Sequence, residues 1–251
     1  MENMVNVKIN NKEYSVPANS TILEAARYAG IDIPTLCYLK DINEIGACRL
    51  CLVEVKGARG LCAACVYPVN EGMEIQTNTP AIRKARKTNL ELVLSAHKKK
   101  CLTCVRSTSC ELQKLCLEYG VDEDHFQGNN NAYPIDFSTA SVVRDNEKCI
   151  LCRRCVAACK NMQGIGVIGA NDRGFDTHIL LLLSSSSLVK PHVSVVVNVS
   201  LLVQLVQSTK EMTHKRYLML FLTQQSTLLS AQLHLSVLLL ANASAMSQVQ
   251  T

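Results

Sequence analysis

Apolar residues occupy alternate positions in the first part of the chain. The alternation runs over residues 5–9, stops at Asn10 and Asn11, and resumes at Tyr14 and Val16. A period of two residues, interrupted by a two-residue turn, predicts a β-hairpin.

A helix and further strands are predicted to follow the hairpin. Thr21 and Glu24 match a capping box, and Gly30 marks the helix end. Short apolar runs at residues 52–55 and 73–77 predict two strands. These elements together predict a small α+β domain with a mixed sheet.

The pattern then changes to that of helices. Thr79 before Pro80 predicts the start of a helix that reaches about Ser95, and a second helix is expected from about Glu111 to Tyr119. Farther along, we expect a strand over residues 141–144 and a hairpin over the glycine-punctuated residues 164–174. The cysteine-rich residues 149–159 between them should form a loop that enters a helix.

Composition divides the chain near Ile179. All 13 cysteines lie between Cys37 and Cys159, whereas residues 180–251 hold only five charged side chains and no glycine or cysteine. We expect an α+β protein with five segments: a mixed α+β domain (1–79), a two-helix domain (80–120), a linker (121–138), a small cysteine-rich domain (139–179) and an unassigned apolar tail (180–251).

The charge of the chain and its lack of targeting signals bear on its partners and its location in the cell. The net charge is +5, and basic residues gather only at residues 98–100, so we expect no nucleic-acid partner. Residues 1–5 lack the basic and apolar regions of a secretory signal, and no continuous apolar run reaches about 18 residues. We therefore predict a cytoplasmic protein with no firm membrane segment, where reduced thiols favour metal or cluster ligation over disulfides.

The first cysteine constellation has one close pair and two outlying members. Cys37, then the pair Cys48 and Cys51, and then either Cys62 or Cys65 supply the four thiolates that two sulfide-bridged irons need. The alternative is a zinc ribbon, which uses two Cys-x2-Cys pairs, and only one such pair occurs here.

The second constellation combines an imidazole with three thiols: His97, Cys101, Cys104 and Cys110. His97 falls just beyond one predicted helix and Cys110 just before the next, so the four side chains should converge on the turn between the helices. The spacing fits a [4Fe–4S] cluster and a Cys3His zinc site equally well. Cys116, on the second helix, is interpreted as a buried apolar residue.

The third constellation is the cysteine run of bacterial ferredoxins: Cys149, Cys152, Cys155 and Cys159. Three of these thiolates bind one [4Fe–4S] cluster, while the fourth serves the partner cluster of a second run. The sequence contains no second run, and Lys160 replaces the proline that normally follows. We therefore expect this site to be incomplete.

Taken together, the three modules resemble a known family. In this order they resemble the amino-terminal half of iron-only [FeFe] hydrogenases and the related electron-entry subunit of NADH:quinone oxidoreductase. The resemblance is carried by residues 34–37, 46–55, 64–69, 97–113 and 148–166, and it extends over about residues 4–179. It implies a β-grasp-like ferredoxin domain for residues 1–79 and a partial bacterial-ferredoxin-like domain for residues 139–179.

The resemblance assigns ligands to two of the sites. It implies a [2Fe–2S] cluster on Cys37, Cys48, Cys51 and Cys65, because the cysteine before the Val66–Val69 turn is the ligand in that family. It likewise implies a [4Fe–4S] cluster rather than zinc on His97, Cys101, Cys104 and Cys110. The family's second ferredoxin run and its hydrogen-activating domain have no match here, so the resemblance implies no catalytic residue.

Valines in the apolar tail have the same spacing as the cysteines of the missing second run. Val193, Val196, Val199 and Val203 repeat the ferredoxin spacing, and valine codons read one base out of register can encode cysteine. We therefore expect residues from about 180 onward to be a frameshifted translation. The alternative is a genuine apolar tail, with a strand over residues 193–206 and a membrane-associated helix over 217–240.

The function we expect is electron transfer by iron–sulfur clusters, in a module derived from an [FeFe] hydrogenase whose catalytic domain is missing. The alternative is an electron-transfer subunit of a larger NADH-linked dehydrogenase or hydrogenase complex. The expected redox partners are a ferredoxin or an NADH-linked flavoprotein subunit. A zinc-binding interaction scaffold is the non-redox alternative.

Overall fold

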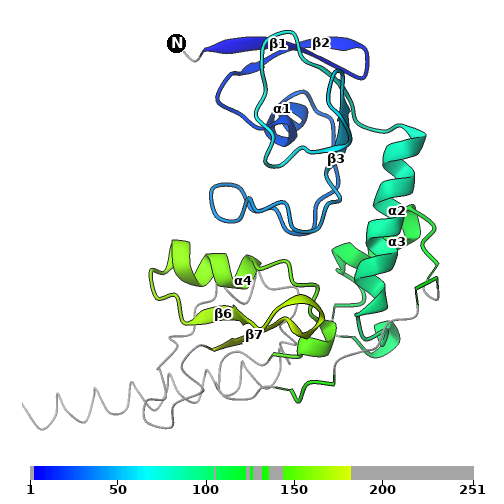
Figure 1. Cartoon of the computed structure of the whole chain (residues 1–251), viewed down its shortest axis with the longest axis vertical. Helices are drawn as coiled ribbons and strands as arrows, with labels where there is room; N and C mark the ends of the chain where they lie inside the picture. The colour runs from blue at the N-terminus through cyan, green and yellow to red at the C-terminus, as the bar shows by residue number, and fades with distance from the viewer. Residues whose placement is uncertain (1–2, 105, 123–124, 127–131, 136–143, 182–251) are drawn as a thin grey trace, which may run out of the picture. The chain divides into compact units, whose positions relative to one another are not determined.

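Five strands form a mixed sheet in the first part of the molecule (Figure 1). The computed structural model describes residues 3–104, 106–122, 125–126, 132–135 and 144–181. The strand order is β2-β1-β5-β3-β4, in which β1 and β5 run parallel and the other pairs antiparallel. The strands are β1 (Met4–Ile9), β2 (Lys12–Pro17), β3 (Leu52–Val55), β4 (Cys62–Ala63) and β5 (Glu74–Gln76).

The predicted hairpin is confirmed by β1 and β2. Asn10 and Asn11 adopt left-handed φ angles of 49° and 68°, which asparagine tolerates and which a tight two-residue turn requires. Val7, Ile9 and Val16 are buried in the core. The strand over residues 52–55 is also confirmed, whereas β5 is shorter than residues 73–77 and β4 was not predicted.

Helix α1 (Ile22–Tyr28) covers the core of this domain (Figure 1). The capping box is present: Glu24 N–H donates to Thr21 Oγ1, and Thr21 N–H donates to Glu24 Oε2 at 3.0 Å. Leu23 N–H donates to the carbonyl of Ala64 at 2.9 Å. The start of α1 therefore fixes the backbone immediately before Cys65.

Two longer helices form a second core. Helix α2 (Pro80–Ser95) begins at Thr79, whose side chain accepts from Ile82 N–H, and α3 (Glu111–Glu118) begins at Cys110. A short 3-10 turn, η1 (Cys101–Thr103), lies between them in the chain. Leu90 and Leu112 pack with Leu36 and Leu50, two residues of the first cysteine loop. The helices are thus packed directly against that loop.

The third cysteine run enters a short helix, as predicted. The elements after residue 143 are η2 (Asn146–Lys148), α4 (Arg154–Ala157), the π-helical turn η3 (Ala158–Met162), β6 (Ile168–Asn171), η4 (Gly174–Asp176) and β7 (His178–Leu181). The hairpin predicted over residues 164–174 is instead formed by β6 and β7. The prediction was displaced because Gly164, Gly166 and Gly174 have positive φ angles and lie in turns outside the strands.

Several predictions concern residues outside the described ranges. These are residues 141–143 of the expected strand, most of the 121–138 linker, and the tail beyond Leu181. In the part of the chain that is described, no helix is long and apolar enough to cross a membrane.

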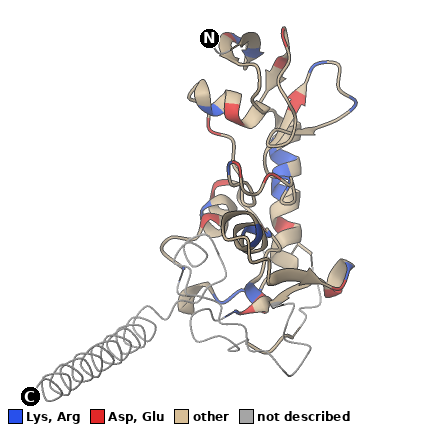
Figure 2. Cartoon of the chain, turned by 90° about the vertical axis from the view of Figure 1, so that its left-hand side faces the viewer, with Lys and Arg blue, Asp and Glu red and all other residues tan. Residues whose placement is uncertain are grey.

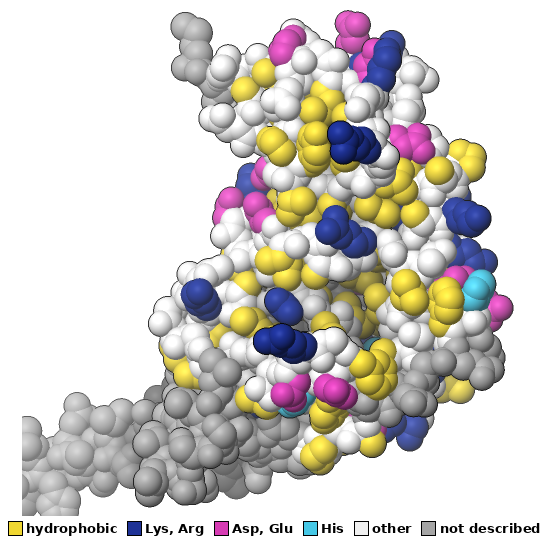
Figure 3. All heavy atoms as spheres, in the orientation of Figure 1, with side chains coloured by type: hydrophobic (Ala, Val, Ile, Leu, Met, Phe, Trp, Pro, Cys, Tyr) yellow, Lys and Arg dark blue, Asp and Glu magenta, His cyan; other side chains and the backbone are white. Residues whose placement is uncertain are grey.

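Charged side chains are distributed unevenly over the elements. Besides residues 98–100, basic side chains also gather on α2 (Figure 2), a cluster that the sequence analysis overlooked: Arg83, Lys84, Arg86 and Lys87. On the face shown in Figure 3, Lys and Arg side chains are interspersed with hydrophobic ones.

Candidate metal centres

Four thiols of the first constellation lie in two interacting pairs. Cys37 and Cys48 share a hydrogen bond, and so do Cys51 and Cys65. Cys37, Cys51 and Cys65 are buried, and Cys48 is half-buried. The charges of Cys37, Cys48 and Cys51 also act on Cys65, so the four sulfurs lie near enough to influence one another.

The local electrostatics favour thiolate in one member of each pair. The hydrogen bond from Cys37 lowers the pKa of Cys48 to about 6, while the same interaction raises the pKa of Cys37. The hydrogen bond with Cys65 likewise lowers the pKa of Cys51 and raises that of Cys65. Because thiolates are the metal-binding form of cysteine, the pairs are prepared for ligation.

The backbone of the loop is shaped around these sulfurs. Leu36 N–H donates to Cys48 Sγ at 3.4 Å. Arg49, directly after Cys48, has a left-handed φ of 52°, a conformation that L-residues adopt at some energetic cost. Gly46 has a φ of 62°, and a Cβ added there would lie 3.9 Å from Cys65 Sγ. That distance is an ordinary van der Waals contact, so it is the positive φ angle that favours glycine at this position.

Cys62 has different surroundings from the four paired thiols. Its half-buried side chain is on β4, with Sγ 3.7 Å from the carbonyl of Gly60. This geometry supports Cys65 as the fourth ligand, as the resemblance implies.

The second constellation surrounds the turn between α2 and α3. His97 lies two residues beyond the end of α2, and its buried Nδ1 has no hydrogen-bond partner. Burial, together with the charge of Lys148, lowers the pKa of His97 and keeps the imidazole neutral, the form that binds metals. An unpartnered buried ring nitrogen is what a ligand histidine presents before metal binds.

The three thiols of this constellation are more accessible than those of the first. Cys101 is exposed, and Cys104 and Cys110 are half-buried. Gln113 N–H donates to Cys110 Sγ at 3.5 Å, so this sulfur caps the N-terminus of α3.

The third constellation is enclosed in its own core. Cys152, Cys155 and Cys159 are buried, and Cys155 and Cys159 pack with Ile168 and Ile179. Burial raises the pKa of Cys149 and of Cys155 to about 12. Without a bound metal, the thiols of Cys149 and Cys155 therefore stay protonated.

The loop of the third constellation repeats features of the first. Leu151 and Arg153 have left-handed φ angles of 53° and 57°. Leu151 N–H donates to Cys149 Sγ at 3.4 Å. Left-handed residues in such loops aim backbone N–H groups inward and form concavities that accept anions, including iron–sulfur clusters.

Two buried side chains join the first and third constellations, and sequence reasoning missed both. Asn43 Nδ2 donates to the carbonyls of Cys37 (2.7 Å) and Cys152 (3.0 Å). Arg154 donates to the carbonyl of Tyr38 at 3.3 Å. The partners are 109 and 116 positions apart in the chain, so no local pattern could have indicated them.

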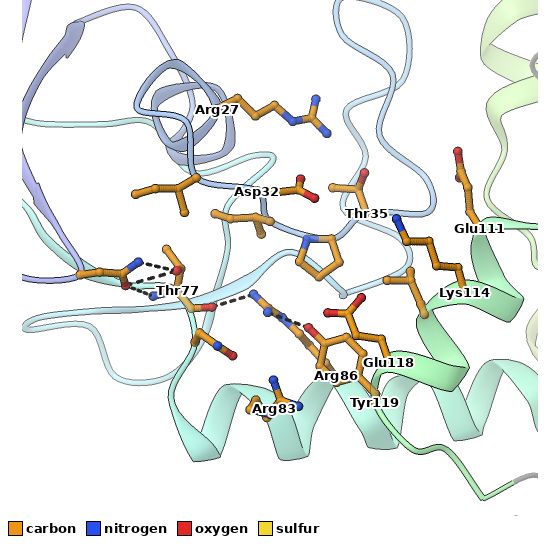
Figure 4. A pocket seen from close by; sticks show the side chains of 16 residues that line it. Arg27, Asp32, Thr35, Thr77, Arg83, Arg86, Glu111, Lys114, Glu118 and Tyr119 are labelled. Atoms are coloured by element: carbon orange, nitrogen blue, oxygen red, sulfur yellow. Dashed lines mark hydrogen bonds between the residues drawn. The ribbon is translucent and has the colours of Figure 1, made fainter.

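A third missed residue, Arg86, ties α2 to its surroundings (Figure 4). Its guanidinium donates to Tyr119 Oη (3.0 Å) and to the carbonyls of Leu52 (2.8 Å) and Thr77 (3.0 Å). Arg86, Thr77 and Tyr119 line a cavity of about 470 Å³ between the first domain and the two helices. Arg86 thus links α2 to the sheet and to the end of α3.

The donor set of the three constellations fits iron–sulfur chemistry. It consists of eleven thiols and one imidazole, soft ligands that suit iron–sulfur clusters and zinc. Among the described residues, no three His, Cys, Asp or Glu side chains converge as closely as the ligands of a single metal ion do. A cluster spreads its ligands around a core of several atoms, so the wider grouping is compatible with it.

Comparison with known families identifies two iron–sulfur regions. Residues 2–80 match the family described as a 2Fe-2S iron-sulfur cluster binding domain. Residues 86–125 match the NADH-ubiquinone oxidoreductase-G iron-sulfur binding region. The chain therefore carries 2Fe–2S and 4Fe–4S binding domains, within a small α+β structure.

Curated relatives include subunits of hydrogenases and of NADH-ubiquinone oxidoreductases. The NADP-reducing hydrogenase subunit HndD of Solidesulfovibrio fructosivorans is 44% identical over 177 residues, which cover 68% of this chain and 30% of the relative. The NADH-ubiquinone oxidoreductase 75 kDa subunit of Reclinomonas americana is 37% identical over 177 residues, covering 70% and 26%. The chain thus spans less than a third of the length of these relatives.

A solved structure has the same fold. The crystal structure of an NAD+-reducing [NiFe]-hydrogenase in the H2-reduced state superimposes with a TM-score of 0.68 at 29% identity, covering 72% of this chain and 76% of that one. The homologues therefore lie among iron–sulfur subunits of NADH-linked oxidoreductases and hydrogenases. They support that broader family rather than the [FeFe] hydrogenases in particular.

Proposed function

We propose that this chain is an iron–sulfur electron-transfer subunit of an NADH- or NADPH-linked dehydrogenase or hydrogenase complex. The succession of a 2Fe–2S domain and an oxidoreductase-G iron–sulfur region supports this proposal. It corresponds to the alternative raised from the sequence, and the named relatives favour it over an origin in an [FeFe] hydrogenase. The observation that carries it is the arrangement of Cys37, Cys48, Cys51 and Cys65 in two interacting pairs, with three of the thiols buried and that of Cys48 half-buried.

The proposed ligands follow the three constellations. A [2Fe–2S] cluster is assigned to Cys37, Cys48, Cys51 and Cys65, and a [4Fe–4S] cluster to His97, Cys101, Cys104 and Cys110. Cys149, Cys152 and Cys155 would hold a second [4Fe–4S] cluster. Cys159, the fourth thiol of that run, is left without a partner run in this sequence. When bound, such clusters accept and return single electrons.

The protein's own residues set the conditions for that chemistry. Burial of Cys37, Cys51 and Cys65 excludes water from the first site, and Leu36 N–H donates to the ligand sulfur of Cys48. Hydrogen bonds to sulfur and burial are the main means by which proteins tune cluster potentials. No acid–base residue is required, and none is assigned.

Metal and sulfide analysis of the full chain tests the proposal. After anaerobic reconstitution, the two complete sites should hold about six irons per chain, and occupation of the third should raise this to about ten. Zinc bound without iron or acid-labile sulfide would overturn the proposal and establish the scaffold alternative.

The identity of the complex is tested separately. As a subunit, the chain should co-purify with a flavin-containing NADH-linked partner, or exchange electrons with a ferredoxin. Because no residue matches a hydrogen-activating site, the chain alone should evolve no hydrogen. Hydrogen evolution by the purified chain would instead favour the [FeFe] hydrogenase origin.

A further inference from the structure

One buried arginine, Arg154, contacts segments from all three constellations. Arg154 stands between Cys152 and Cys155 in the third cysteine run and is only 8% exposed. It is the first residue of α4, and the preceding Arg153 is exposed to solvent. Two adjacent arginines thus have opposite environments, and only one is enclosed by protein.

The buried guanidinium reaches both of the other constellations. Its Nη2 donates to the carbonyl of Tyr38, the residue after Cys37, at 3.3 Å. Its Nη1 donates to Glu111 Oε2, on the residue after Cys110, at 3.2 Å. One side chain therefore contacts segments that directly adjoin a proposed ligand from each constellation.

The charge of Arg154 is not fully compensated by these contacts. Glu111 is its ion-pair partner, but that carboxylate is 51% exposed, and the buried Nε of Arg154 has no partner. Burying a cation is costly unless negative charge lies nearby. Thiolates of the adjacent site would provide that charge.

We propose that Arg154 is a positioning residue that joins the three ligand-bearing segments and places a fixed positive charge at their junction. This inference rests on the proposed function in one respect, because the charge acts on bound clusters. Adding an electron to a cluster adds negative charge, which a nearby cation stabilises. Arg154 should therefore make reduction of the adjacent cluster more favourable.

Three variants of the full chain separate the two roles. Arg154→Gln removes the charge, and Arg154→Lys keeps it but loses the planar fork that reaches two partners at once. Arg153→Gln removes the same charge from the exposed neighbour and is the matched control. Backbone hydrogen exchange is measured without bound iron, and reduction potentials are measured after reconstitution by titration monitored with electron paramagnetic resonance (EPR).

Each role has its own expected result. Both Arg154 variants should lose protection from hydrogen exchange at residues 37–43 and 110–113, whereas Arg153→Gln should not. Arg154→Gln should lower the reduction potential of the adjacent cluster. That cluster is the one whose EPR signal Cys152→Ser abolishes, or the [2Fe–2S] cluster if its signal is the one that shifts. Arg154→Lys keeps the charge and should return the potential most of the way to the wild-type value.

The opposite results would overturn the inference. Unchanged protection in Arg154→Gln would show that the arginine does not join the segments. A potential shift of equal size in Arg153→Gln would show that burial at the junction is irrelevant. A wild-type chain that binds no iron would instead contradict the proposed function, while hydrogen exchange would still decide whether Arg154 joins the segments.

Discussion

Cys62 and Cys65 lie three positions apart, and spacing alone leaves either as the fourth thiol of the first site. In the folded chain, Cys65 is completely buried and hydrogen-bonded to Cys51, whereas Cys62 is half-buried on β4. We predict that Cys65→Ser lowers the iron content by about two per chain and abolishes the [2Fe–2S] EPR signal. Cys62→Ser is the control and should retain both; the reverse outcome would move the ligand to Cys62.

Asn43 is a second residue with a defined task. Its amide donates to the carbonyls of Cys37 and Cys152. Asn43→Leu would leave both buried carbonyls without that donor. We expect the free energy of unfolding to fall by about 1–3 kcal/mol in urea denaturation. Asn161 also links the two modules, donating to the carbonyl of Ile42, but it is exposed. Asn161→Leu should therefore change stability by less than about 0.5 kcal/mol, and equal losses would refute the role of Asn43.

At the residue scale, the sequence indicated the candidate ligands but not the residues that hydrogen-bond to the ligand-bearing segments. Cysteine spacing is a local property of the chain, so the three constellations could be identified from it. Asn43 and Arg154 have ordinary local surroundings, and their partners are brought to them by the tertiary fold. Residues of this kind can be found only when the segments are seen together.

At the scale of elements, Arg86 holds α2 to the sheet and to α3. Replacing it with leucine leaves the carbonyls of Leu52 and Thr77 and the hydroxyl of Tyr119 without their donor. We predict that Arg86→Leu lowers the free energy of unfolding by about 1–3 kcal/mol, and Tyr119→Phe, which removes one bond, by about 0.5–1.5 kcal/mol. Chemical denaturation of both variants checks the order, and a larger loss for Tyr119→Phe would contradict it.

Local signals predicted the elements well wherever they were strong. The capping box at Thr21, the proline after Thr79 and the Asn10–Asn11 turn each mark an observed boundary. The last hairpin was misplaced because the prediction put the glycines within the hairpin, whereas in the structure they lie in η4 and in turns. The short β4 has only two residues, too few for a periodic pattern.

At the scale of the whole molecule, the composition of the chain changes abruptly near Ile179, after which glycine and cysteine are absent and charged residues are few. Strand β7 passes through this point: Ile179 is buried against the third cysteine run, and pairing continues to Leu181. The proposal of a frameshift from about residue 180 makes a direct prediction about the gene. Read one base out of register, the codons of Val193, Val196, Val199 and Val203 should encode cysteines, and stop codons or unrelated residues there would refute it.

The central claim is that the chain carries single electrons on iron–sulfur clusters, and a reductive titration tests it most directly. The anaerobically reconstituted full chain is titrated with a calibrated reductant while absorbance and EPR are recorded. We predict reversible uptake of at least two electrons per chain, one for each complete cluster, with two distinguishable EPR signals. A chain that takes up no electrons, or that bleaches irreversibly without an EPR signal, would contradict the account.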